Sequence, residues 1–553
     1  MKKVVIGILG LVFLLVGVIW INRVEIILHI PRYILDFKQP IGPNREIVWD
    51  RGPSSSSKNS ALRKPNIIVI LVDDLGFNDI SFYAEDKSQA TLNTPNIDTL
   101  AEEGVSFTNA YSVSPVCAPA RAALLTGRYP TRFGYEFMAL PNGMGKMIDM
   151  LDREKKGRLR YPVVSSKNMD NIIDFDDMGM PTEEITVAET LKKGGYHTVH
   201  IGKWHLGRKS SFRAEAQGFD ESLLMDSMLY LPEDHPEVVN VKLDYDPIDR
   251  FLWANGRFSA SFNGGERFEP GGYLTDYYTD EAIKVIEANQ HRPFFLYLAH
   301  WGIHAPLQAS KADYDALSHI KDKKLRVYSA MIRALDRSVG RIMETLKDKG
   351  LEDNTMIVFS SDNGGPGYIG IPTINHPYRG WKLTMFEGGT HVPFFIKWPK
   401  KIPAGISYSK PVSHMDIHAI AAEISGVNLP DDRVIDGVNL LPYAIGEKRG
   451  NPHNTLFWRQ GHYQAVLSKG WKMQVAQFPK KVWLFNLKND PTERQNLSDE
   501  YPEKVAELKE LLQKHNAEQA EPLWPSVFRA AVSIDKTLDQ PQSPDDEYVF
   551  WPN

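Results

Sequence analysis

The sequence is almost without cysteine: Cys117 is the single one in 553 residues. A lone cysteine cannot form a disulfide within the chain, and it cannot by itself build a thiolate zinc or iron–sulfur site. An isolated cysteine usually serves as a small buried apolar side chain. A chemical role for Cys117 therefore has to be argued from the residues around it.

A charge bias of either sign is also lacking. The chain has 64 Lys and Arg against 69 Asp and Glu, a net charge of −5, and both signs are scattered along it. Proteins that bind nucleic acid need a concentrated positive patch. We therefore expect no nucleic-acid partner. The sequence shows no internal repeat, and its hydrophobic fraction of 42% is that of an ordinary globular protein.

Charged residues are missing altogether from Val4 to Ile21, directly after Lys2 and Lys3. As a helix this run would span roughly 27 Å, close to the ~30 Å hydrocarbon core of a bilayer. The two lysines favour a cytoplasmic N-terminus. A cleaved secretory signal has a similar pattern and remains the alternative. We expect residues 1–27 to be an anchor or signal, and the rest to be exported.

Four apolar runs rich in β-branched and aromatic residues predict strands that are buried on both faces. They are residues 66–72, 197–201, 294–298 and 356–359. Helix-like stretches are expected between them, at residues 96–103, 187–193, 276–289 and 325–349. Strands that alternate with helices favour an α/β fold, in which helices sandwich a large, mostly parallel sheet.

The remaining segments suggest the domain organisation. Residues 38–62 are rich in Pro, Gly and Ser, which is typical of a tether. After Pro442 the pattern changes to shorter segments and then a helix near 501–518, which predicts a smaller α+β subdomain with an antiparallel sheet. The expected divisions are an anchor or signal at 1–27, a linker at 28–62, the main domain at 63–445, and the C-terminal subdomain and tail at 446–553.

Polar residues follow each of the four predicted strands. They are Asp73 and Asp74, Lys203 and His205, His300 and His304, and Asp362 and Asn363. Alone, either acidic pair could be a turn or a helix cap. His205 and His304 could be polar residues with ordinary hydrogen-bond partners, and Lys203 could be a surface residue. In an open α/β sheet, however, the ligand crevice lies beyond the carboxyl ends of the strands. These side chains are therefore expected to converge on one site.

The acidic members of this set point to a cation. The carboxylates of Asp73, Asp74 and Asp362 and the carbonyl of Asn363 are hard oxygen ligands, which suit Ca²⁺ or Mg²⁺ and not zinc. Three neighbouring carboxylates repel one another strongly unless a cation lies between them. A metal ion with lysine and histidine around it makes a site for an anion.

The segment that contains the lone cysteine runs from Cys117-Ala118-Pro119-Ala120-Arg121 to Leu125-Thr126-Gly127-Arg128. It resembles the C-x-P-x-R and L-T-G motif of the type I sulfatases, although the family most often has Ser at the position of Ala120. Pro119 suits a first helical turn. Cys117 is then expected just before a helix N-terminus, where negative charge is favoured.

The resemblance extends along nearly the whole exported chain. Similar segments, in the family's order, are Val72–Gly76, Thr94–Asp98, Ile201–Gly207, His304–Pro306, Ser361–Gly364, Arg379–Lys382, Glu387–Gly389, Leu484–Leu487, Asp490–Pro491 and Asn496–Leu497. It implies an alkaline-phosphatase-like fold, with residues 63–445 as the sulfatase catalytic domain.

The resemblance also implies a chemistry. A maturation enzyme would oxidise Cys117 to formylglycine (3-oxoalanine) before folding, and the hydrated aldehyde would be the nucleophile. The implied Ca²⁺ ligands are Asp73, Asp74, Cys117, Asp362 and Asn363. The implied catalytic residues are Cys117, Arg121, Lys203, His205, His304 and Lys382. In this scheme His304 is the general acid for the leaving oxygen, and His205 takes the proton that lets sulfate leave. Lys382 and Lys203 hold the sulfate.

The expected activity is hydrolysis of sulfate esters on a sulfated oligo- or polysaccharide, in polysaccharide degradation. Candidate substrate-binding residues are His300, His376, Arg379 and His391. The expected location is a bacterial periplasm, anchored to the inner membrane, or the medium after signal cleavage. Two alternatives are a phosphonate or phosphate-diester hydrolase of the same superfamily and an inactive carbohydrate-binding homologue.

Overall fold

The computed structural model describes residues 16–55, 63–84, 86–141, 143–154 and 158–553, together with Leu9 and Leu14. Of the apolar run Val4–Ile21, the residues before Val16 are not described, except Leu9 and Leu14. Within the part that is described, no helix is both long and apolar enough to cross a bilayer. The anchor or signal at residues 1–27 therefore stays a prediction.

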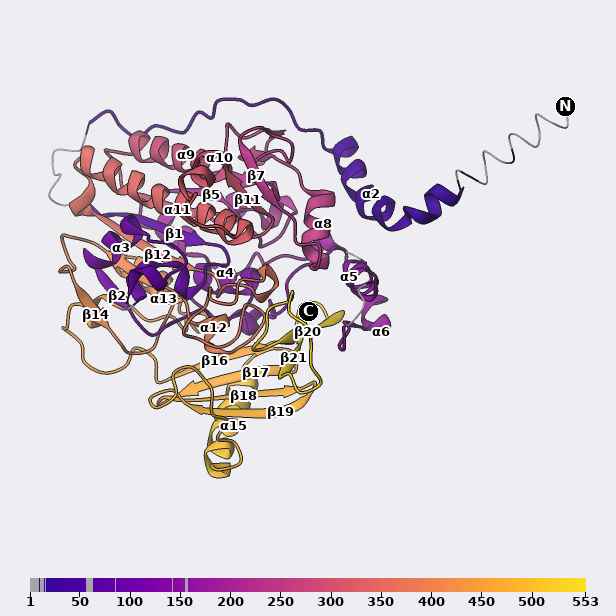
Figure 1. The fold of residues 1–553 in the computed structure, drawn as a ribbon. Helices are drawn as coiled ribbons and strands as arrows, with labels where there is room; N and C mark the ends of the chain where they lie inside the picture. The colour runs from indigo at the N-terminus through magenta and orange to yellow at the C-terminus, as the bar shows by residue number, and fades with distance from the viewer. Residues whose placement is uncertain are drawn as a thin grey trace.

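A ten-stranded sheet forms the centre of the described chain (Figure 1). From edge to edge its strands are β14 (Ile406–Tyr408), β2 (Val105–Phe107), β13 (Phe394–Lys397), β12 (Thr355–Ser361), β1 (Asn66–Val72), β10 (Phe294–Ala299), β5 (His197–Gly202), β6 (Glu221–Met225), β8 (Ala260–Phe262) and β9 (Arg267–Phe268). The strands from β12 to β6 are parallel, and antiparallel pairs flank them on both sides. The four predicted strands are confirmed as neighbours in the middle of this sheet.

Helices cover both faces of the sheet. In β1, successive side chains point to opposite faces and pack against different helices. Ile67, Val69 and Leu71 belong to a buried cluster with α4 (Cys117–Thr126), α7 (Val187–Lys193) and α13 (Asp416–Ser425). The alternate residues Ile68, Ile70 and Val72 pack with α3 (Pro95–Glu102), α9 (Leu274–Ala288) and α11 (Lys323–Asp348). Because both faces are buried, the strand is a continuous apolar run. The predicted sandwich and its four helices are confirmed.

The C-terminal part adds an antiparallel sheet, as expected. Its order is β16 (Thr455–Gln460), β17 (Tyr463–Ser468), β18 (Trp471–Gln477) and β19 (Lys480–Asn486), and α15 (Pro502–Asn516) packs on it. The tail then forms β20 (Phe528–Ser533) and β21 (Tyr548–Pro552), and β20 pairs with β4 (Val163–Val164) of the main domain. The tail therefore returns to the main domain.

Shorter elements connect these layers. The helices are α5 (Met144–Arg153), α6 (Ser166–Met169), α8 (Pro247–Asn255), α10 (Lys311–Ala316), α12 (Glu387–Thr390) and α14 (Leu441–Ala444). The strands are β3 (Ala110–Tyr111), which pairs with β15 (Val412–Ser413), and β7 (Val238–Val241), which pairs with β11 (Leu307–Ser310).

The segment predicted as a linker has structure of its own. Its first residues belong to α2 (Arg23–Lys38), which lies beside α8 at the periphery of the molecule (Figure 1). Gly42 then bridges to Phe268 at the edge of the central sheet. Buried Trp49 donates a hydrogen bond to Glu281 of α9 (2.7 Å). Residues 41–50 are therefore fixed to the main domain. The division of the chain into domains itself stays a prediction.

Candidate active site

The polar residues after the four central strands meet at the carboxyl edge of the sheet. Asp73 and Asp74 follow β1, Lys203 follows β5, His304 follows β10, and Asp362 follows β12. These strands are parallel neighbours, so that their carboxyl ends lie side by side. The structure brings these residues together as the sequence predicts, whereas His300, which was expected with them, lies elsewhere.

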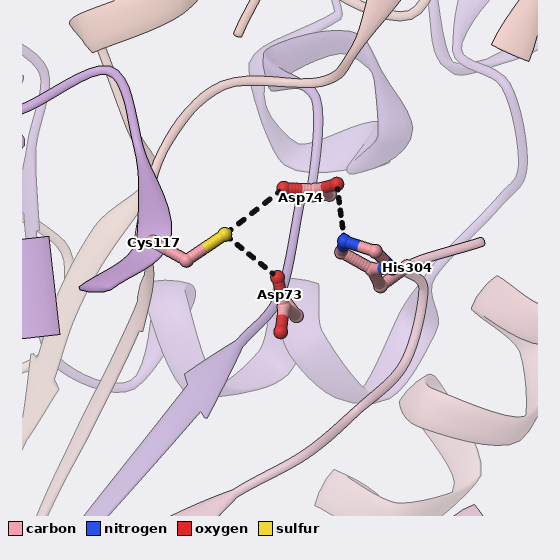
Figure 2. A group of neighbouring side chains, drawn as sticks. All are labelled: Asp73, Asp74, Cys117 and His304. Carbon is pink, nitrogen blue, oxygen red and sulfur yellow. Dashed lines mark hydrogen bonds and ion pairs between the residues drawn. The ribbon is translucent and has the colours of Figure 1, made fainter. Parts of the chain in front are cut away.

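Cys117 enters this cluster from α4. It is the first residue of the helix, with a side chain 1% exposed, and its Sγ lies 3.5 Å from Asp73 Oδ1 and 3.9 Å from Asp74 Oδ1 (Figure 2). Burial raises the pKa of the thiol above its usual range. Cys117 is therefore a protonated thiol against two carboxylates, which is no environment for a thiolate nucleophile.

Arg121, one turn further along α4, is fully buried and joins the carboxylates. Its Nε donates to Asp362 Oδ2 (2.9 Å) and its Nη2 to Asp73 Oδ2 (3.2 Å). Its Nη1 donates to the backbone oxygen of Lys203 (3.0 Å). The planar guanidinium places three separate nitrogens against these acceptors, whereas the donors of a lysine all share one nitrogen.

The carboxylates are held as anions to unequal degrees. Burial opposes ionisation of Asp73, but Lys203 and Arg121 lower its pKa well below the usual range. Burial opposes it at Asp74 too, and Lys382 and His304 lower the pKa there. At Asp362, burial and the negative charge of Asp73 together raise the pKa to about 6. The three carboxylates thus face three cations, Arg121, Lys203 and Lys382, and burial still raises the pKa of Asp362.

Asp74 is the meeting point of the donors. Its φ of 62° lies in the left-handed region, where a non-glycine residue is strained. This conformation directs the carboxylate at Lys382 Nζ (2.7 Å) and Asn363 Nδ2 (2.7 Å). Tyr368 adds a third donor through its hydroxyl (2.9 Å).

Two histidines border the cluster. His304 stacks on the ring of Trp301 with centroids 4.1 Å apart, its Nδ1 lies 2.6 Å from the oxygen of Ala305, and its Nε2 lies 3.6 Å from Asp74 Oδ2 (Figure 2). Burial lowers the pKa of His304 to about 4. His205 has a φ of 63°, and its buried Nδ1 has no hydrogen-bond partner. Burial and Lys203 lower the pKa of His205.

The donor set fits a hard cation. Ligand atoms of Asp73, Asp74, Cys117 and His304 all lie within 4.8 Å of one another. The buried Oδ1 of Asn363 accepts no hydrogen bond, so that a carbonyl oxygen is free for coordination. Carboxylate oxygens and an unpartnered amide oxygen are the hard ligands that Ca²⁺ prefers. His304 borders this set but was not among the ligands predicted from the sequence, and its imidazole nitrogen is not the oxygen ligand that Ca²⁺ prefers.

Three of the four predicted substrate-binding residues have partners outside this cluster. His300 is fully buried, and its Nε2 lies 3.0 Å from the hydroxyl of Ser338 of α11. Helix α11 packs on the opposite face of the sheet from α4. Both ring nitrogens of His391 are engaged, by Glu387 and by the oxygen of Thr108 (2.9 Å each). Arg379 is buried among carboxylates of the C-terminal tail. His376 is exposed. The structure therefore places His300, Arg379 and His391 outside the cluster, and the role of all four residues in substrate binding stays a prediction.

Two aromatic residues also belong to the site, and of these the sequence pointed to Trp301 and gave no role to Tyr368. Tyr368 bonds Asp74 and accepts from Lys382 Nζ (3.3 Å). Trp301 supports His304 and also has Lys203 Nζ 4.7 Å from its ring centre. Trp301 is expected near the site because it follows β10. Tyr368 follows Asp362 in a loop, where no spacing rule identifies it.

The C-terminal tail holds the two segments that carry Tyr368 and Lys382. Arg379, three residues before Lys382, pairs with Asp535 and Glu547 (2.5 Å each). Gly367, beside Tyr368, accepts a hydrogen bond from the amide of Leu538 (3.0 Å). The tail thus braces the side of the site that faces Asp74.

Comparison with known families agrees with the motif. The model described as Sulfatase matches residues 65–427, and a second, described as N-sulphoglucosamine sulphohydrolase, C-terminal, matches residues 379–520. Human N-acetylgalactosamine-6-sulfatase is 31% identical over 83% of this chain and 86% of its own length. The N-acetylgalactosamine-6-O-sulfatase of Bacteroides thetaiotaomicron is 28% identical over 85% of this chain and 96% of its own.

Solved structures agree as well. Ps i-CgsB in complex with k-i-k-neocarrahexaose has 31% identity and a TM-score of 0.66, over 84% of this chain and 95% of its own. A phosphonate monoester hydrolase from Silicibacter pomeroyi has 16% identity and a TM-score of 0.56, over 83% of this chain and 96% of its own, which shows a shared fold alone.

Proposed function

The chain belongs to the sulfatase family, and we propose that it hydrolyses sulfate esters of a sulfated oligo- or polysaccharide. The observation that carries the proposal is the position of Cys117. The motif cysteine lies against two carboxylates and is ringed by Arg121, Lys203 and Lys382. The relatives support the carbohydrate, since two are N-acetylgalactosamine sulfatases and one binds a neocarrahexaose by their names.

We further propose that the mature site holds Ca²⁺ and a formylglycine made from Cys117. The oxygens of Asp73, Asp74, Asp362 and Asn363 would hold the ion beside residue 117. When present, these groups supply a geminal-diol nucleophile and a Lewis acid that lowers the pKa of its hydroxyl. The raised pKa of the Cys117 thiol supports a modified nucleophile, because the unmodified thiol would stay protonated at neutral pH.

The remaining residues divide the work on the sulfate group. Lys203 pairs with Asp73, and Lys382 pairs with Asp74. A sulfate between them would be held by two cations, which stabilise the charge that develops on its oxygens. Arg121 keeps Asp362 and Asp73 in place through its Nε and Nη2, and its Nη1 holds the backbone of Lys203.

Proton transfer is assigned to the two histidines. His304 would donate a proton from Nε2 to the leaving sugar oxygen. Its pKa of about 4 means that it is neutral at pH 7 before substrate binds. A bound sulfate ester brings negative charge close to the ring and raises that pKa, so that substrate binding itself would load the acid. His205, with its free Nδ1, would accept the proton whose removal releases sulfate.

Location and maturation extend the proposal. We propose that the enzyme is held at the bacterial inner membrane by residues 1–27 and works in the periplasm. Secretion after signal cleavage is the alternative. A formylglycine-generating enzyme would have to act on the Cys117-Ala-Pro-Ala-Arg121 segment before folding, because the folded structure leaves Cys117 1% exposed.

Hydrolysis of 4-nitrophenyl sulfate, compared with bis(4-nitrophenyl) phosphate, tests the activity. We expect the protein from a host with a maturation system to turn over the sulfate far faster. Mass spectrometry of the Cys117 peptide should show formylglycine in the same preparation. Cys117→Ser, made in a host that does not modify serine, should bind sulfate esters but not turn them over. Steady-state turnover by that variant would refute the mechanism, and a preference for the phosphodiester would refute the function.

A further inference from the structure

Helix α2 carries an apolar stripe that nothing in the described structure covers. Most of the exposed large apolar side chains of the described residues lie before residue 38. On α2 they are Ile26, Ile27, Ile30, Tyr33, Ile34 and Phe37, with Tyr33 69% and Phe37 90% exposed. Residues three and four apart share one face of a helix, so that these side chains form a continuous stripe along α2.

The opposite face of α2 is the one that contacts the protein. Leu28 is 2% exposed and packs against Leu151 of α5 and Ala254 of α8. Asn255 at the end of α8 donates to the oxygen of Leu28 (2.9 Å). One face of α2 therefore packs on the protein. The apolar stripe on its other face is exposed even though the helix is docked.

Ion pairs with the main domain take up both acidic residues of α2. Glu25 pairs with Arg250 (2.8 Å), and Asp36 pairs with Arg257 (2.9 Å). The basic residues Arg23 and Lys38, at the two ends of the helix, have no acidic partner among the described residues, although Arg23 lies over the ring of Trp20. The free side of α2 is thus apolar along its middle and positive at its ends.

We propose that this face of α2 lies in the headgroup region of an anionic lipid bilayer, parallel to its surface. An apolar stripe flanked by basic residues, with an aromatic residue at its border, is the composition of a helix that binds at a membrane interface. An exposed stripe of this length is unusual for a soluble surface. The apolar residues 16–21 directly precede α2 and are exposed as well, so the lipid contact would be continuous with the N-terminal segment.

The short segment after α2 limits how the catalytic domain can be oriented at a membrane. Gly42 is bonded to the edge strand β9 through Arg267 and Glu269, and Asp50 pairs with Arg292 (3.0 Å). Only a few residues thus separate α2 from a fixed point on the catalytic domain. A membrane contact through α2 would therefore fix which side of the enzyme faces the bilayer, which a flexible tether would not do. This inference goes beyond the proposed catalytic function and does not depend on it.

Depth-dependent fluorescence quenching tests the proposal on the full-length chain. Ile30→Cys and Phe37→Cys each place one accessible thiol on the bare stripe, and both sites are exposed, so folding is not at risk. Cys117 is buried and does not compete for the label. The labelled protein is reconstituted into phosphatidylethanolamine–phosphatidylglycerol vesicles with an NBD group at the new cysteine. We expect doxyl lipids with the spin label near the headgroup to remove most of the emission, and aqueous iodide to remove little.

Val434→Cys is the matched control, because Val434 is also an exposed apolar residue, 53% exposed, on the catalytic domain. Its label should be quenched by iodide and not by doxyl lipid. Three results at Ile30 and Phe37 would overturn the proposal. They are quenching by iodide alone, strongest quenching by spin labels at the bilayer centre, and protection from both quenchers with cross-linking between two copies. The last would identify a second chain as the occupant.

Discussion

His304 presents its Nε2 to the cluster from the face of Trp301, while its Nδ1 is occupied by the oxygen of Ala305. A general acid matters most when the leaving group is a poor one. We expect His304→Ala to lower kcat/KM for a sugar sulfate by about 10²–10⁴-fold. The loss should be much smaller for 4-nitrophenyl sulfate, whose leaving group needs no proton. Equal losses on the two substrates would remove His304 from this role.

Lys382→Ala is the useful comparison, because a residue that holds the sulfate acts on both substrates alike. Its loss of kcat/KM should be similar for the sugar and the aryl ester. The two variants together separate proton donation from sulfate binding.

Asp79 has no part in the proposed reaction, and it allows a test of how the stability of the fold depends on pH. It is fully buried, its Oδ2 accepts from the amide of Gly76 (2.8 Å) and the hydroxyl of Tyr328 (2.7 Å), and burial raises its pKa to about 7. A pKa raised on folding adds stability that is complete below the ordinary value near 4 and is lost as pH rises through 7. Asp79→Asn carries no such dependence. The stability of the parent relative to this variant should therefore be about 2–3 kcal/mol greater at pH 5 than at pH 8.

Urea unfolding at the two pH values measures this difference. The exposed Asp545→Asn is the control, and its stability relative to the parent should not change with pH. A difference for Asp79→Asn that stays constant from pH 5 to pH 8 would show that Asp79 is already ionised in the folded protein.

For single residues, the sequence predicted the positions that follow from strand ends and from the cysteine motif. It placed His300 wrongly, because nearness to a strand end does not say which way a side chain points. His300 follows Ala299 of β10, and its side chain turns to Ser338 of α11, away from Cys117. It could not assign Tyr368, because a loop residue reaches Asp74 only through the folded path of its segment.

At the scale of elements, the tail is the part whose role the structure adds. It holds Arg379 through Asp535 and Glu547, and Gly367 through Leu538. The double variant Asp535→Asn, Glu547→Gln leaves the guanidinium of Arg379 without its carboxylates and loosens the segment of Lys382. A small misplacement of such a group is costly. We expect kcat/KM to fall by roughly tenfold or more, with KM for 4-nitrophenyl sulfate raised.

Asp545→Asn serves again as the control, since it lies in the same tail and is exposed. It should leave both constants unchanged. A double variant with the parent's kcat and KM, but a lower Tm, would show that the tail only stabilises the fold.

Among the elements, the sequence predicted the long buried strands and the helices between them nearly to the residue. It did not predict the flanking strands β2, β13, β8 and β9, because these are two to four residues long and their pattern is too short to identify. Helix α2 was also missed. Its apolar residues had been divided between an anchor and a linker, and the contact of Leu28 with α8 is a tertiary effect.

At the scale of the whole molecule, the cation site is expected to make the stability of the fold depend on bound metal. Asp73, Asp74 and Asp362 repel one another in the folded protein more than in the unfolded chain. An ion that binds only the folded form stabilises it by about 2.7 kcal/mol at a hundredfold excess over Kd. We expect Ca²⁺ to raise Tm relative to EDTA in thermal unfolding, whether or not Cys117 has been modified.

Asn363→Ala removes the unpartnered amide oxygen and should reduce the rise in Tm caused by Ca²⁺. The exposed Asp86→Asn should not change it. The same Tm in Ca²⁺, Mg²⁺ and EDTA would mean that no cation binds this cluster.

The burial of Cys117 governs what a preparation of this enzyme contains. A side chain 1% exposed at the start of α4 cannot be reached by a modifying enzyme once the chain has folded. Under the proposed maturation, each molecule is therefore committed as active or inactive before it folds, and no later treatment converts one into the other. Purified protein is then a fixed mixture of two populations. Its specific activity measures the fraction that was modified during synthesis, whereas KM, a property of the active molecules alone, stays the same from batch to batch.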